Sequence, residues 1–163
     1  MANQSIQILP ATRDDVGQIL LFIRELAEYE KLSDCVVATE ALLQEHLFGP
    51  RPTAECVIAR VDGKPAGFAL FFHNFSTFLA KPGIYLEDLY VRPQFRGNGV
   101  GKALLRHLAQ LVVERKCGRL EWAVLDWNAP AIGFYRRLGA VPMNDWHVYR
   151  LSGDSLSALA TGQ

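Results

Sequence analysis

The residues with the clearest chemical pattern in this chain lie between positions 85 and 102. The sequence there reads Tyr-Leu-Glu-Asp-Leu-Tyr-Val-Arg-Pro-Gln-Phe-Arg-Gly-Asn-Gly-Val-Gly-Lys, which predicts a strand, a glycine-rich turn and the start of a helix. The first N–H groups of a helix lack partners within it and carry the positive end of its dipole, and glycine lets an anion approach them closely. This stretch therefore predicts a site for a diphosphate group.

Two common phosphate motifs do not match these glycines. A nucleotide P-loop needs glycine at 96 and Ser or Thr after Lys102, but Arg96 and Ala103 stand there. A dinucleotide-binding fingerprint that starts at Gly97 needs a third glycine at 102, but that position is Lys. The pattern that remains is Gln94-x-x-Gly97-x-Gly99.

The other reactive side chains are scattered along the chain and predict no metal site. The cysteines form no CxxC pair and the histidines no HExxH pair; they are Cys35, Cys56 and Cys117, and His46, His73, His107 and His147. We therefore expect a protein that binds no metal.

The composition excludes several classes of partner. The chain has 163 residues, with 17 basic and 17 acidic side chains, so no strong field attracts nucleic acid. No segment approaches the roughly 18 consecutive apolar residues of a membrane span, and the first residues lack a secretory pattern. We expect a cytoplasmic protein that binds neither nucleic acid nor membrane.

The hydrophobic periodicity predicts one α/β domain over residues 1–163, with the element order β-α-α-β-β-β-α-β-α-β-β. Strands are predicted over 5–9, 56–61, 65–72, 84–91, 119–125, 140–143 and 146–151, and helices over 15–30, 39–48, 100–114 and 129–139. Asp62-Gly63 predicts a tight hairpin, a loop of about ten residues precedes position 84, and the last ten residues are expected to fray.

The glycine pattern, in this order of elements, resembles the Q/R-x-x-G-x-G/A motif of the GCN5-related N-acetyltransferases (GNAT). Further segments are similar to the diamine (spermidine/spermine) and thialysine acetyltransferases of that family: residues 24–30, Tyr85-Leu-Glu-Asp, Trp127-Asn128 followed by Phe134-Tyr135, and residues 137–140. The resemblance implies a single mixed, mostly antiparallel sheet flanked by helices. It also implies acetyl-CoA as co-substrate, a primary amine of a small molecule as acceptor, direct transfer, and a homodimer.

The resemblance implies two catalytic residues whose chemistry suits acetyl transfer. An aliphatic amine, with a pKa near 10.4, must lose a proton before it attacks a thioester; Glu87 could act as that base or anchor the amine. Tyr135 matches the family's catalytic tyrosine, and its phenol stays protonated at neutral pH and could protonate the departing thiolate. A splayed strand near Leu89 could offer a backbone N–H to the oxyanion.

The resemblance also implies two sets of binding residues. Cofactor binding falls to Leu89, Tyr90, Val91, Arg96, Gly97, Asn98, Gly99, Val100, Gly101, Lys102, Asn128 and Phe134. Acceptor binding falls to Tyr29, Glu30, Glu87, Asp88 and Trp127, through charge and cation–π contacts. The loop at 73–78 is a further candidate to line the acceptor site.

The identity of the acceptor stays open at this level. The stretch 141–146 is short and contains a single acid, which argues against a polyamine. A lysine or thialysine analogue would suit a site with fewer acids, and an unknown small amine is equally open. Two alternatives also remain: acetylation of a protein lysine or N-terminus, and a non-catalytic sensor that only binds CoA.

Overall fold

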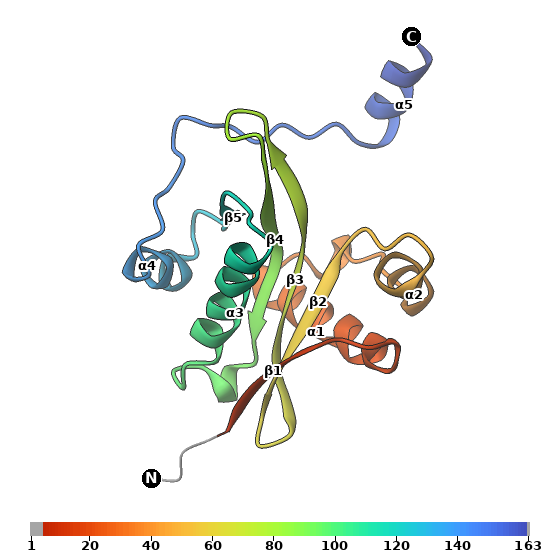
Figure 1. Ribbon diagram of the computed structural model, residues 1–163. Coiled ribbons are helices and arrows are strands. Elements are labelled where there is room, and N and C mark those ends of the chain that lie inside the picture. Colours follow the sequence, from red (N-terminus) through yellow and green to blue (C-terminus); the bar gives the residue numbers. More distant parts are fainter. Residues whose placement is uncertain (1–4, 163) are drawn as a thin grey trace. The chain divides into compact units, whose positions relative to one another are not determined.

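The computed structural model describes residues 5–162 (Figure 1). Its contacts divide the chain into two compact units, with the boundary in the sequence between Ala123 and Val124. The first unit contains the sheet and the glycine-rich turn. The second contains two helices joined by an extended segment.

The sheet of the first unit has five strands in the order β1 to β5. They are β1 (Ile6–Pro10), β2 (Glu55–Val61), β3 (Lys64–Ser76), β4 (Lys81–Val91) and β5 (Leu120–Trp122). All neighbours pair antiparallel except β4 and β5, which are parallel. The predicted fold class, a mixed and mostly antiparallel sheet flanked by helices, is confirmed.

Helices cover both faces of this sheet, with α3 on one face and α1 and α2 on the other (Figure 1). The α-helices are α1 (Val16–Glu30), α2 (Glu40–Phe48) and α3 (Val100–Glu114), and short 3-10 turns span Arg13–Asp15, Ser33–Cys35 and Pro93–Phe95. Burial of four consecutive β2 residues, 56–59, fits a strand covered on both sides.

The starts of α1 and α2 follow their capping residues. The Asp15 carboxylate accepts hydrogen bonds from the Thr12 N–H and hydroxyl, both at 2.9 Å, and Thr39 accepts from the Leu42 N–H at 3.3 Å. These bonds satisfy N–H and hydroxyl donors at the helix starts. Both predicted helices are confirmed, although a 3-10 turn precedes α1.

Two hairpins connect β2 to β3 and β3 to β4, which places β4 between β3 and the edge strand β5. Asp62 and Gly63 both have positive φ, 48° and 78°, as the tight hairpin turn between β2 and β3 requires. The hairpin between β3 and β4 is longer than predicted: its strands continue to Ser76 and from Lys81, so the expected ten-residue loop is wrong. The cause is continued cross-strand pairing, from His73 with Ile84 outward to the tip.

The second unit departs from the sequence prediction at its end. Helix α4 (Ala129–Arg137) is confirmed, but the predicted strands over 140–143 and 146–151 are wrong. A strand needs a partner for its ladder, and this extended segment has none among residues 5–162; its side chains are exposed, with Tyr149 at 92%. The expected frayed end is also wrong, since α5 (Gly153–Thr161) forms there.

Candidate active site

The glycine-rich turn at the start of α3, called the cradle below, has open space around its glycines. Gly97 and Gly99 have φ of 79° and 85°, and a Cβ at either position would meet no atom within 4 Å. The first helical bond of α3 runs from the Ala103 N–H to the Gly99 carbonyl at 2.9 Å, so the amides at 100–102 have no partner within the helix. No acidic residue occupies the first turn, and the turn therefore fits a diphosphate.

Arg96 fixes this turn to the body of the first unit. Its Nε donates to the Val91 carbonyl at 2.8 Å, and its guanidinium lies over the rings of Tyr29, at 4.7 Å, and Tyr90, at 5.7 Å. The Arg96 side chain, predicted to bind the cofactor, thus holds the end of β4 against α1. Tyr29, predicted to bind the acceptor, lies beside the cofactor turn.

A second arginine anchors the same segment. The Arg92 guanidinium donates to both carboxylate oxygens of Glu25, with a shortest distance of 2.7 Å, and to the Pro65 carbonyl at 3.1 Å. It also lies 4.8 Å from the centre of the Phe22 ring. The end of β4 is therefore bound to α1 and β3 immediately before the cradle begins.

Strand β4 loses one neighbour halfway along its length. β5 pairs only with Ile84–Leu86, so β5 is shorter than the predicted strand over 119–125, and beyond Leu86 no described strand pairs with that edge of β4. On the other edge, Leu70 pairs with Asp88 and Phe71 with Leu86, which leaves Glu87 in a bulge. The unpaired edge at 89–91 offers backbone groups to a ligand that lies along it.

Glu87 and Asp88 are adjacent at this bulge, and Glu30 at the end of α1 is near enough to act on Asp88 electrostatically. Burial, with the nearby charges of Glu87 and Glu30, raises the pKa of Asp88 to about 6. Burial also raises the pKa of Glu30, at the end of α1. Like charges held together in a partly desolvated place favour a cation between them, so this cluster suits an ammonium group.

Two predicted cofactor residues turn their side chains into the core. Tyr90 is 6% exposed and packs against Phe22, with ring centroids 6.3 Å apart, and Val100 is 1% exposed. Only their backbone groups are therefore available to a ligand. Gly101, Lys102 and Asn98 complete the cradle, and Leu89 and Val91 lie on the unpaired stretch of β4.

The second unit carries the remaining predicted residues on and beside α4. Asn128 is buried and caps the helix, accepting from the Ala131 N–H at 3.3 Å. Phe134 and Tyr135 follow on α4 with ring centroids 5.5 Å apart, and the Trp127 side chain, just before the cap, is 49% exposed. One short element thus holds four candidate residues in a fixed local arrangement.

Comparison with known proteins gives the family of this chain. Residues 21–140 match the model of the Acetyltransferase (GNAT) family, and this range includes the cradle, the acidic cluster and α4. The chain belongs to the GNAT family. It is therefore an acetyl-CoA-dependent N-acetyltransferase, as the glycine pattern and the Phe-Tyr pair implied.

Several GNAT relatives cover nearly all of the chain. A thialysine N-epsilon-acetyltransferase of Bos taurus is 38% identical over 95% of this chain and 97% of its own length. An L-ornithine N5-acetyltransferase of Arabidopsis thaliana is 33% identical over 91% of this chain and 85% of its own length. The solved structure of an integron cassette protein from the mobile metagenome of V. cholerae has a TM-score of 0.80 at 28% identity, over 96% and 98% of the two chains.

Some features of this GNAT site were not predicted from the sequence. The anchoring of Arg92 by Glu25 joins residues 67 positions apart, and no local pattern indicates it. Basic residues Arg106 and His107 line a groove on α3; the four-residue spacing of Lys102 and Arg106 was the available signal. Within residues 5–162 no group of three or more His, Cys, Asp or Glu could hold a metal ion, and no helix is long and apolar enough to cross a bilayer.

Proposed function

We propose that this GNAT enzyme acetylates the terminal amine of a small, lysine-like molecule. The observation that carries the proposal is the acidic cluster of Glu30, Glu87 and Asp88 at the β4 bulge, a place that suits an ammonium group. The names of the bovine and plant relatives both specify a terminal side-chain amine, N-epsilon of thialysine and N5 of ornithine. Three clustered carboxylates suffice for one such amine.

The cradle and the unpaired edge of β4 fit acetyl-CoA. The amides at 100–102, with Gly97 and Gly99, would hold the diphosphate, and the backbone of Leu89 to Val91 would hold the pantetheine arm. Bound acetyl-CoA supplies the thioester that the amine attacks. Asn128 and Phe134 are proposed as further contacts to it.

The proposed catalytic roles divide between carboxylates and a phenol. Glu87 takes the proton of the ammonium group directly or through a water, while Glu30 and Asp88 hold the charge of the acceptor. A backbone N–H near Leu89 donates to the carbonyl oxygen as negative charge develops there. Tyr135 donates its phenolic proton to the departing sulfur, and Tyr29 and Trp127 give aromatic contact to the acceptor.

A thiol-release assay with a panel of acceptors tests this function. Thialysine, lysine and ornithine should give the highest kcat/KM, polyamines a lower one, and peptides with an internal lysine or a free N-terminus none above background. A preference for spermidine or spermine would assign a polyamine acceptor instead, and a preference for peptides a protein acceptor. Binding of acetyl-CoA without thiol release on any acceptor would indicate a sensor.

We further propose that the enzyme is a cytoplasmic homodimer with no nucleic-acid or membrane partner. The equal numbers of acidic and basic residues argue against nucleic acid. The cysteines at 35, 56 and 117 are all free, as in a reducing compartment. The family match over 21–140 includes parts of both compact units, which supports one catalytic domain over residues 1–163.

A further inference from the structure

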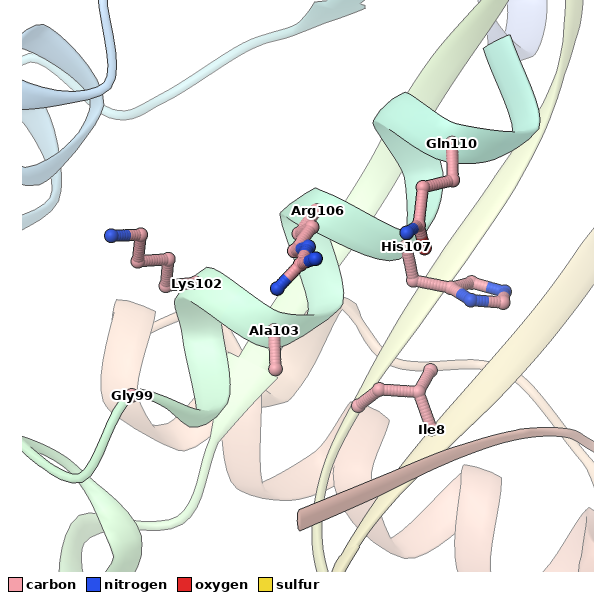
Figure 2. Close-up of a pocket in the computed structure, with 7 residues that line it drawn as sticks. All are labelled: Ile8, Gly99, Lys102, Ala103, Arg106, His107 and Gln110. Atoms are coloured by element: carbon pink, nitrogen blue, oxygen red, sulfur yellow. The ribbon is translucent and has the colours of Figure 1, made fainter. Parts of the chain in front are cut away.

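A groove runs along α3 beside the edge strand β1, starting at the cradle. It has a volume of about 390 Å³ and is lined by Ile8, Gly99, Lys102, Ala103, Arg106, His107 and Gln110 (Figure 2). From Gly99 to Gln110 the helix advances about 16 Å. This length and volume suit a nucleoside-sized ligand.

The charges of this groove are all of one sign. Its ionisable side chains are Lys102, Arg106 and His107, and no carboxylate lines it. Lys102 and Arg106 stand one helical turn apart, where like charges repel, and Lys102 also lies in the first turn, where the helix dipole disfavours a cation. Within residues 5–162 neither side chain forms a salt bridge. A multivalent anion in the groove would relieve this repulsion.

The groove also has an apolar side. Figure 2 shows the His107 ring on the same side of α3 as Ile8 of β1, while Lys102 extends from the helix in the opposite direction. The Lys102 and Arg106 side chains are both exposed. Ile8 and Ala103 provide apolar surface, and the Gln110 amide provides both a donor and an acceptor. An aromatic base could lie on this surface while an attached phosphate reaches the two cations.

One ligand joins these features to the adjoining cradle. CoA carries a diphosphate on the 5′ oxygen and a phosphate monoester on the 3′ oxygen of one adenosine, and Gly99 belongs to both the cradle and the groove. We propose that Lys102 and Arg106 bind the 3′-phosphate of CoA and so make the enzyme selective for CoA over 3′-dephospho-CoA. This inference rests on the proposed cofactor site, and it adds Arg106 to the residues that bind CoA.

Calorimetric titration with CoA and with 3′-dephospho-CoA tests the proposal. The unmodified enzyme should bind CoA about tenfold more tightly, because charge-assisted hydrogen bonds to the extra phosphate are lost in dephospho-CoA. Arg106→Ala, alone and with Lys102→Ala, should bring the ratio within about twofold by weakening CoA binding. The matched control Arg51→Ala, which removes an exposed cation on the segment after α2, should keep the tenfold ratio.

Each other outcome has a distinct meaning. Equal affinity for the two ligands in the unmodified enzyme, or equal weakening of both in Arg106→Ala, would overturn the 3′-phosphate assignment and leave the proposed function intact. No binding of either ligand would overturn both. In competition experiments, adenosine 3′,5′-diphosphate should displace CoA at a far lower concentration than inorganic phosphate does. Displacement at equal concentrations would assign the groove to free phosphate.

Discussion

At the scale of single residues, the proposed chemistry depends on one phenol of α4. Replacing Tyr135 by Phe removes the proton that we assign to the departing sulfur. Turnover should fall by about a hundredfold while the Kd of acetyl-CoA changes less than about twofold. Stopped assays of thiol release and calorimetric titration measure the two quantities.

Tyr149→Phe is the matched control, since this tyrosine is 92% exposed on the extended segment. Turnover of that variant should equal the wild-type value. If Tyr135→Phe also retained full turnover, the phenol would have no role in the reaction.

Asp88 makes a second prediction at this scale, on stability. Its pKa is raised from 3.8 to about 6, mainly by burial, so the folded protein binds more protons than the unfolded chain between these values. Stability contributed by this group therefore falls as pH rises from about 4 to about 6 and stays low above it. Asp88→Asn should stabilise the fold at pH 7.5 by up to about 3 kcal/mol and leave it unchanged near pH 3.5.

Urea denaturation at the two pH values measures this difference. Glu87→Gln should give a smaller effect of the same sign, because it removes one of the charges that raise the Asp88 pKa. A stabilisation of Asp88→Asn that is equal at both pH values would show that ionisation of this carboxyl is not its cause.

At the scale of elements, the cradle depends on backbone geometry that glycine permits. Gly99→Ala places a Cβ at φ 85°, which should cost about 1 kcal/mol of stability and weaken acetyl-CoA binding about tenfold by reshaping the turn. Gly63→Ala is the matched control, since its φ is 78° and its Cβ also meets open space, in the hairpin between β2 and β3. It should lose similar stability and bind acetyl-CoA normally.

Thermal denaturation and titration of both variants separate strain from binding. The cradle assignment would fail if the two variants lost acetyl-CoA affinity equally, or if Gly99→Ala lost none.

The link between β4 and α1 gives a prediction about packing. Arg92 and Glu25 are 18% and 24% exposed, so Arg92→Met leaves a largely desolvated carboxylate and should destabilise the fold by about 2 kcal/mol. Arg119 pairs with Glu121 at 40% and 34% exposure, and Arg119→Met should cost less than about 1 kcal/mol. Chemical denaturation compares them, and similar losses would show that burial does not set the strength of these pairs.

Most elements of the first unit could be predicted because local patterns specify them. Three boundaries are each set by residues no more than four positions apart in the sequence: Thr12 with Asp15, Thr39 with Leu42, and Asp62 with Gly63. The length of β3 and β4 could not be predicted in this way, since it depends on pairing across the hairpin. The same holds for the site. The cradle follows from adjacent residues, whereas the effect of Glu30 on Asp88 and the contact of Arg96 with Tyr29 join distant ones.

At the scale of the whole molecule, the extended segment before α5 predicts self-association. Trp146, Val148 and Tyr149 are 72%, 86% and 92% exposed, an apolar run that a single chain leaves in water. Sedimentation equilibrium should give about twice the chain mass of 18.2 kDa. Val148→Glu should shift the mass toward one chain, and a monomeric unmodified protein would exclude the homodimer.

The wrong strand predictions near the C-terminal end also concern this exposed segment. The pattern of side chains at 146–151 predicted a strand. Such a pattern indicates which side chains are apolar, but it does not provide the neighbouring strand that a β-ladder requires. In the single chain the segment stays unpaired and exposed. The sequence therefore indicated an extended segment correctly. The prediction that this segment pairs in a sheet was wrong, because pairing depends on a second strand.

Strand β5 pairs with only the first half of β4, and this should affect hydrogen exchange of the β4 amides in the free enzyme. The amides of residues 84–86 lie in a strand bordered on both sides, while those of 89–91 have strand β3 on one side only. Deuterium should enter the second group sooner. The pantetheine arm of bound CoA would lie along residues 89–91 in the place of a neighbouring strand. Addition of CoA should therefore slow deuterium uptake at these amides.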